Sequence, residues 1–246
     1  MAEVRDEAFT RFWINFSTGR DVDVQEPEAN LEGSSALVPP LLSEAKGVVL
    51  DIGPGSGSHV PLFTKHAKQI KRIYGAEPCL GLHDELKKKI AAAGLNKKYT
   101  ILSCSAERSS LLSALEKSNP SQGPTPSYEI FDAIICFRVL CSVPNPEGAV
   151  SDLYKILKPG GKLIVCEHTI NPWRSAKGSL VARLLQSFYQ FCGWSFFVGN
   201  CNLERDMKRT LLQAAVPDGG WQNVSLQRDF EWSPLPYLSG SLVKKT

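Results

Sequence analysis

Three glycines and two acidic residues are spaced as a nucleoside-binding turn would require. The glycines follow Asp51 at intervals of two residues, directly after an apolar, β-branched run: Gly53, Gly55 and Gly57. Glu77 comes twenty residues after the last of them. A glycine turn lets a ligand approach the backbone because no Cβ stands in the way. A carboxylate that ends the next strand can accept both ribose hydroxyls of an adenosine. The pattern therefore favours a bound nucleoside over a strand-to-helix turn that only packs.

The identity of the nucleoside needs a separate argument, because an acidic residue at this distance would also suit NAD. The dinucleotide fingerprint is G-x-G-x-x-G, with its third glycine inside the following helix and the pyrophosphate at the helix N-terminus. Here the third glycine, Gly57, comes one residue earlier. The spacing therefore departs from the dinucleotide pattern.

The elements that must position these residues alternate between strands and helices. Apolar runs predict strands over 47–52, 72–78, 99–107, within 129–143, and over 162–168, 224–230 and 237–245, and helical spacing predicts helices over 82–95, 148–161 and 202–215. Such alternation predicts a doubly wound α/β sheet that is covered on both faces. Its ligand belongs at the carboxyl ends of the strands, where the strand order reverses.

Four motifs occur in the order that class I S-adenosylmethionine-dependent methyltransferases use. They are LDIGPGSG at the turn, the acidic Glu77, the pair Ala106 and Glu107, and LKPGG at 157–161. The chain resembles that superfamily over residues ~48 to 168. The resemblance implies a Rossmann-like, seven-stranded, mostly parallel sheet with helices on both faces, and S-adenosyl-L-methionine as the cofactor.

The second half resembles the methyltransferase-like seven family of thiol S-methyltransferases. The segments that carry this likeness are FRVLCSV, CEH at 166–168, GNCNLERD at 199–206 and PLPYLSGSLVKK. It implies S-methylation of a small thiol. Two alternatives stay open: O-methylation, and a cyclisation or elimination with no methyl transfer. Members of the family carry an apolar N-terminal membrane anchor, whereas the N-terminus here is charged, so we expect no transmembrane segment.

The superfamily pattern also implies which residues bind the cofactor. Its methionine part would lie against Asp51 and the turn, and Glu77 would accept the ribose hydroxyls. The full set of expected cofactor residues is Asp51, Gly53, Pro54, Gly55, Gly57, Glu77, Pro78, Ser105, Ala106, Glu107, Phe137, Arg138 and Val139.

Structural alternatives accompany several of these residues. Glu107 could simply cap the helix that follows it. Arg138 could form an ion pair at the end of its strand, and Pro78 could serve only the turn. His168 ends a strand at the rim where acceptors dock, so it is the candidate catalytic base, and a hydrogen-bonded structural histidine is the alternative.

Aromatic and aliphatic residues in two segments are candidates for an acceptor-covering surface. Leu184, Phe188 and Phe191 recur at helical spacing, and Trp194, Phe196 and Phe197 follow. A core-facing helix is the alternative. Phe9, Phe12, Trp13 and Phe16 mark one face of an N-terminal helix. These apolar segments predict a lipophilic small-molecule acceptor. We do not expect a nucleic acid, because the sequence has no stripe of interleaved basic and aromatic residues.

Composition sets the remaining expectations for this chain of 246 residues. Its formal net charge of +3 and 43% hydrophobic content predict a globular domain without a strong field toward nucleic acid. Seven scattered cysteines without a C-x-x-C pair predict reduced thiols, a cytoplasmic location and no metal site. We expect an N-terminal helix and covering loop over 1–46, and a methyltransferase domain over 47–246 with a substrate-covering insert at about 170–200.

Overall fold

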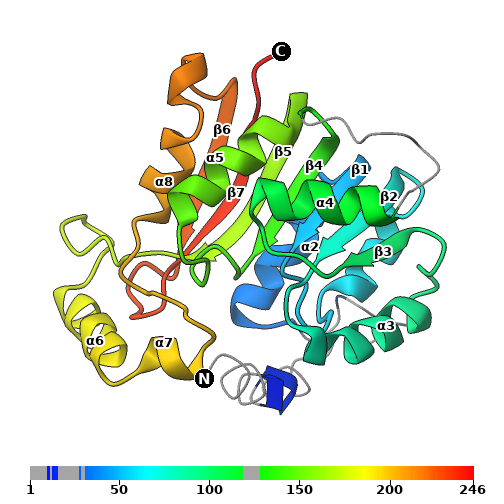
Figure 1. Cartoon of the computed structure of the whole chain (residues 1–246). Coiled ribbons are helices and arrows are strands. Elements are labelled where there is room, and N and C mark those ends of the chain that lie inside the picture. The colour runs from blue at the N-terminus through cyan, green and yellow to red at the C-terminus, as the bar shows by residue number, and fades with distance from the viewer. Residues whose placement is uncertain (1–9, 12, 16–27, 29–30, 119–127) are drawn as a thin grey trace.

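The computed structural model describes residues 10–11, 13–15, 28, 31–118 and 128–246, and its centre is a seven-stranded sheet (Figure 1). The strand order is β3-β2-β1-β4-β5-β7-β6. The strands are β1 (Gly47–Ile52), β2 (Ile70–Ala76), β3 (Tyr99–Leu102), β4 (Phe131–Phe137), β5 (Leu157–His168), β6 (Asn223–Asp229) and β7 (Tyr237–Val243). Strands β1 to β5 pair in parallel, and β7 pairs antiparallel with both β5 and β6. The fold class expected from the sequence is confirmed.

Helices cover both faces of this sheet, as alternating side chains on β1 require. Leu50 and Ile52 join a core with α4, α5 and α8, whereas Val49 joins a second core with α2, η2 and α3. The helices are η1 (Gly33–Leu37), α2 (Val38–Leu42), η2 (Val60–His66), η3 (Leu80–Leu82), α3 (His83–Ala92), α4 (Arg108–Ser118), α5 (Pro146–Ile156), α6 (Leu180–Phe191), α7 (Trp194–Phe197), α8 (Met207–Gln213) and η4 (Val216–Asp218).

The strand order reverses at β1, which pairs with β2 on one side and with β4 on the other. The connections that leave β1 and β4 therefore diverge at the carboxyl edge of the sheet. In open α/β sheets this divergence opens the crevice in which ligands bind. The glycine turn, Glu77 and Arg138 all follow strands at this edge.

The largest differences between the expected and the observed element boundaries each have a local reason. Strand β3 ends at Leu102 because its neighbour β2 ends at the paired Ala76. Residues 157–161 belong to β5 and not to the preceding helix, because a Pro-Gly-Gly run does not continue a helix. Helix α8 begins only at Met207, since the side chain of Asp206 accepts a hydrogen bond from Arg209 N and caps it there.

The described part of the chain holds no helix long and apolar enough to cross a membrane. Residues 10–11 and 13–15 are helical, in agreement with the expected N-terminal helix. Phe9, Phe12 and Phe16 lie outside the described residues.

Candidate cofactor and acceptor site

The turn after β1 uses glycine because other parts of the chain approach its backbone closely. Gly53 and Gly55 have φ of 59° and 60°, a left-handed conformation that favours glycine. A Cβ on Gly53 would lie 2.5 Å from Val139 Cγ2, and a Cβ on Gly55 would lie 2.8 Å from Trp13 Nε1. The structure thus brings Gly53 and Val139 together, and their expected contacts with the cofactor stay predictions.

Glu77 lies one residue beyond β2 and joins that strand to the glycine turn. Gly55 N donates to Glu77 Oε2 at 2.8 Å, and Cys79 N donates to Oε1 at 2.9 Å. Burial raises the pKa of Glu77 above its usual value, although the N–H groups of Cys79 and Gly55 oppose the shift. Each carboxylate oxygen keeps a further lone pair, so Glu77 can still accept two hydroxyls.

Asp51 is fully buried and is engaged by two side chains of the protein. His59 Nε2 lies 2.9 and 3.1 Å from its two oxygens, and the Tyr99 hydroxyl donates to Oδ2 at 2.7 Å. Asp51 shares a sheet face with Val49, two residues earlier, which explains why its partners come from the core that contains η2. These contacts hold the Asp51 carboxylate in a fixed position. Its expected contact with the methionine part of the cofactor stays a prediction.

The segment between β3 and α4 reaches toward Glu77. Burial and the charge of Glu77 raise the pKa of the Cys104 thiol to about 11. Ala106 is buried, and Ser105 Oγ accepts a hydrogen bond from Glu107 N at 3.4 Å. The Glu107 side chain is exposed, while its backbone carbonyl accepts from Leu111 N at the start of α4. The backbone of Glu107 thus begins the helix, and its expected contact with the cofactor stays a prediction, as does that of the exposed Pro78.

The chain leaves β4 in a strained conformation, which is typical of functional sites. Arg138 has φ of 58°, uncommon for a residue with a side chain. Its guanidinium Nη1 lies 3.5 Å from the hydroxyls of Ser34 and Ser35. Val139 N donates to Glu167 Oε1 at 2.9 Å, and burial raises the pKa of Glu167 to about 7. These contacts fix the loop that faces the turn, and Phe137 before it is buried with its ring 5.6 Å from that of His59.

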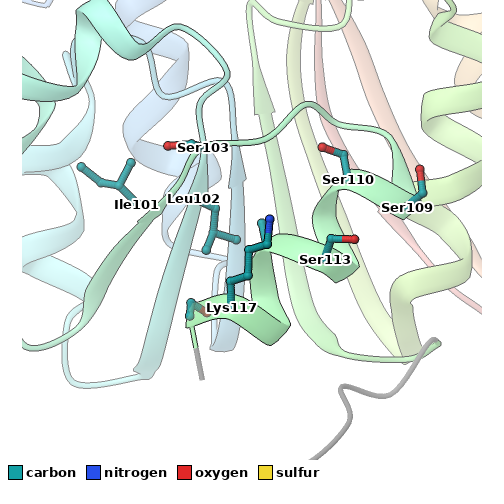
Figure 2. A pocket seen from close by; sticks show the side chains of 9 residues that line it. Ile101, Leu102, Ser103, Ser109, Ser110, Ser113 and Lys117 are labelled. Atoms are coloured by element: carbon teal, nitrogen blue, oxygen red, sulfur yellow. The ribbon is translucent and has the colours of Figure 1, made fainter. Parts of the chain in front are cut away.

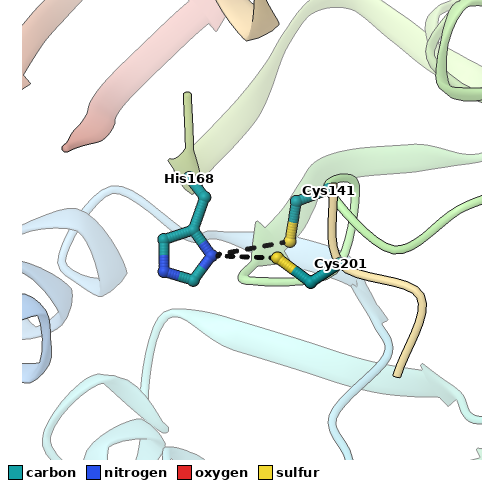
Figure 3. A group of neighbouring side chains, drawn as sticks. All are labelled: Cys141, His168 and Cys201. Carbon is teal, nitrogen blue, oxygen red and sulfur yellow. Dashed lines mark hydrogen bonds between the residues drawn. The ribbon is translucent and has the colours of Figure 1, made fainter. Parts of the chain in front are cut away.

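His168 ends β5 and contacts two buried thiols (Figure 3). Its Nδ1 lies 3.4 Å from Cys201 Sγ and 3.8 Å from Cys141 Sγ. The sequence analysis missed this group because the three residues are separated by tens of positions and match no metal-ligand spacing. Each residue nevertheless lies in a segment that the resemblance had singled out: FRVLCSV, CEH and GNCNLERD.

Helix α6 presents its apolar residues outward, so the core-facing alternative is wrong for them. Phe188 is 58% exposed and Phe191 is 89% exposed, and Leu184 is exposed as well. The inward side instead carries Gln186, whose amide accepts from Asn171 N at 3.0 Å and donates to Thr169 O at 3.1 Å. The helix is therefore anchored by polar contacts and leaves an apolar surface available to an acceptor.

Part of the N-terminal segment lies against the glycine turn and the residues after β2. The Thr10 hydroxyl is 3.2 Å from Cys79 Sγ, and the indole of Trp13 lies against Gly55. The expected covering role of the N-terminal helix stays a prediction.

A separate hollow of about 690 Å³ lies between β3 and α4 (Figure 2). Its lining is rich in serine hydroxyls and includes Lys117 near the end of α4. It contains none of the residues expected to bind the cofactor, so it does not define the candidate site.

Comparisons with known proteins agree with this geometry. The chain matches the model of the methyltransferase domain family over residues 27–232. It is 29% identical over 116 residues to thiol S-methyltransferase TMT1B of Rattus norvegicus, a match that covers 46% of this chain and 43% of that protein. A putative methyltransferase of Bacillus halodurans superimposes with a TM-score of 0.56 at 18% identity, over 80% of this chain and 73% of that one. The cyclase SpnF superimposes with a TM-score of 0.57 at 16% identity, over 90% and 72%. The alignment thus spans under half of the curated relative, and the solved structures share the fold.

Proposed function

This chain belongs to the methyltransferase domain family, and from this premise we propose that it is an S-adenosylmethionine-dependent methyltransferase that methylates the sulfur of a lipophilic small-molecule thiol. The observation that carries the cofactor site is the buried Glu77 carboxylate, held at the end of β2 by the N–H of Gly55. The likeness to thiol S-methyltransferases supports sulfur as the acceptor atom.

The residues at the carboxyl edge fit an adenosyl sulfonium nucleoside. Each oxygen of Glu77 accepts one N–H among the described residues and keeps a lone pair for a ribose hydroxyl, and three of the five turn residues, Gly53, Gly55 and Gly57, have no Cβ. We infer that Pro54, the glycines and Asp51 border the methionine part, while Pro78, Ser105, Ala106 and Glu107 border the adenosine. Phe137, Arg138 and Val139 lie between this cradle and the acceptor in the proposal.

The chemistry asks mainly for alignment. S-adenosylmethionine supplies a methyl group that its sulfonium has already activated. The protein then has to hold the acceptor lone pair in line with the departing sulfur, which contributes ~7–11 kcal/mol by removing the entropy of encounter. A thiol is partly ionised near neutral pH and needs little help from a base.

The acceptor is lipophilic in this proposal because of the surface beside the site. Helices α6 and α7 expose Phe188, Phe191, Phe196 and Phe197 after the carboxyl end of β5, where the substrate-covering insert was expected. Trp13, in the described part of the N-terminal segment, lies against Gly55. We propose that this segment, within 1–46, and the insert at about 170–200 cover the acceptor on the domain formed by 47–246.

Two measurements test the proposal. Calorimetry with S-adenosylmethionine and with NAD should give binding for the first ligand alone, and binding of NAD alone would contradict the cofactor assignment. Mass spectrometry of alkyl thiols, aryl thiols and phenols after incubation with protein and cofactor should show one added methyl on the thiols. Methylated phenols without methylated thiols would favour the O-methyltransferase alternative, in which His168 is the base. Cofactor binding without a methylated product in any class would favour a reaction without methyl transfer.

A further inference from the structure

Two cysteines and one histidine that are distant in sequence meet beyond the ends of β4 and β5. Cys141 follows β4, His168 ends β5, and Cys201 lies between α7 and α8 (Figure 3). The ligand atoms of the three side chains lie within 4.8 Å of one another, and all three side chains are buried. Two sulfurs and one ring nitrogen therefore converge on a single point in the interior.

Hydrogen bonds join these side chains without a metal, and Cys141 Sγ also has Ser142 Oγ at 3.8 Å and Cys201 as partners. Both sulfurs approach the same ring nitrogen, His168 Nδ1, at 3.4 and 3.8 Å. That nitrogen holds either one proton or one lone pair, so it can pair well with only one of the sulfurs. A metal ion, in contrast, binds all three donors at once.

The spacing of the donors matches tetrahedral zinc. Zinc–sulfur bonds of about 2.3 Å and zinc–nitrogen bonds of about 2.0–2.1 Å, at the tetrahedral angle, separate nitrogen from sulfur by about 3.6 Å. The two observed separations, 3.4 and 3.8 Å, lie on either side of that value. Thiolate and imidazole ligands select zinc over magnesium or calcium, which prefer oxygen.

We propose that Cys141, His168 and Cys201 bind one zinc ion, with the fourth position taken by a ligand from outside these three residues. Closed structural zinc sites have four protein ligands, whereas three protein ligands leave one position for exchange. With three protein ligands, this site would keep one coordination position open for exchange.

The surroundings support an ion at this point. The buried indole N–H of Trp194 lies at the Cys201 thiol. Its ring packs on the cysteines, with its centroid 6.5 Å from that of His168. A metal-bound thiolate at Cys201 would accept a hydrogen bond from this N–H, as ligands of bound metals commonly do from neighbouring donors. Leu203 and Tyr189 complete an apolar wall.

Metal content of the full-length protein tests the site directly. Purified chain exposed to zinc and then freed of loose metal should retain close to one zinc per chain by mass spectrometric elemental analysis. Cys141→Ser and Cys201→Ser should each remove most of that zinc. Cys192→Ser is the matched control, because Cys192 is an exposed thiol on a neighbouring segment, and it should retain the metal.

A second readout uses the unsubstituted protein and so does not depend on whether a variant folds. Cobalt added to metal-free chain should give thiolate-to-cobalt charge-transfer absorption and the visible bands of tetrahedral cobalt. Absence of retained zinc and of these bands, or equal zinc loss in the Cys192→Ser control, would overturn the proposal. Detection of a Cys141–Cys201 disulfide as the main state would overturn it as well. Neither readout requires S-adenosylmethionine, so failure of the proposed function leaves this result unaffected.

Discussion

Asp51 and Glu77 are both buried carboxylates, but they differ in their hydrogen-bond partners. The carboxylate of Asp51 is already engaged by the His59 ring and by the Tyr99 hydroxyl. Glu77 accepts only two backbone N–H groups and keeps lone pairs for a ligand. Burial makes the charged form of Glu77 costly and outweighs the hydrogen bonds from the Cys79 and Gly55 N–H groups, which is the physical reason for its raised pKa.

We therefore predict that Glu77→Gln weakens cofactor binding. Hydrogen bonds to a charged group contribute ~1.5–3 kcal/mol, so the dissociation constant for S-adenosylmethionine should rise about 10- to 150-fold. Calorimetry measures this change. The exposed Glu116→Gln is the control, and equal affinity in the two variants would contradict the role of Glu77.

The effect of Glu77→Gln on the free energy of unfolding should depend on pH, and the sign of this dependence follows from the raised pKa of Glu77. In the folded state Glu77 binds its proton up to a higher pH than in the unfolded chain, where its pKa is near 4.5. The wild type therefore loses free energy of unfolding, relative to Glu77→Gln, as pH rises from about 4.5 through the folded-state pKa. Urea denaturation at pH 5 and pH 7.5 should show that the wild type loses more free energy of unfolding than Glu77→Gln between these two pH values. A smaller loss in the wild type than in Glu77→Gln would contradict the raised pKa.

At the scale of elements, the sequence predicted order better than boundaries. The strand–turn unit at 47–57 was predictable because β-branched residues and glycines mark it locally. The early end of β3 and the late start of α8 were not, since the first depends on the length of β2 and the second on the Asp206 cap. The outward apolar face of α6 was also hidden, because helical spacing does not say which side meets the core.

The glycine turn makes a prediction that separates backbone strain from close contact. Gly53 and Gly94 both have positive φ, but a Cβ on Gly94 meets nothing within 4 Å, whereas one on Gly53 meets Val139. Gly94→Ala should therefore cost only the left-handed conformation, ~1–2 kcal/mol. Gly53→Ala adds overpacking of ~1–3 kcal/mol and should also weaken cofactor binding. Chemical denaturation and calorimetry of both variants measure this, and identical behaviour would show that the Val139 contact has no effect.

At the buried position 186 of helix α6, an apolar substitution should destabilise the protein. Gln186→Leu would leave Asn171 N and Thr169 O buried without their amide partner, so we expect a loss of about 2–4 kcal/mol in the free energy of unfolding. Phe191→Ser removes an exposed ring and should change it by less than ~0.5 kcal/mol. Urea denaturation of both variants is the measurement. A neutral Gln186→Leu would mean that α6 is not anchored through this amide.

At the scale of the whole molecule, the site is assembled from segments that only the fold brings together. Trp13, Gly55, Glu77 and Val139 come from the N-terminus and from the ends of three strands. The resemblance to a family predicted most of these positions. It did not predict that Cys141, His168 and Cys201 meet, because their contact depends on the chain returning after α7 to the end of β5.

Because the segments of the site come from the whole chain, cofactor binding should stabilise the whole fold. A ligand at 100 times its dissociation constant adds ~2.7 kcal/mol when it binds only the folded state. For a chain of this size one kcal/mol corresponds to about 2–4 °C, so S-adenosylmethionine should raise the melting temperature by about 5–10 °C. NAD at the same concentration should leave the melting temperature unchanged, and Glu77→Gln should need a higher concentration of S-adenosylmethionine for the same shift. Thermal unfolding followed by circular dichroism measures all three. An equal rise in melting temperature with NAD would mean that the cleft binds a dinucleotide, because only a ligand that binds the folded state stabilises it.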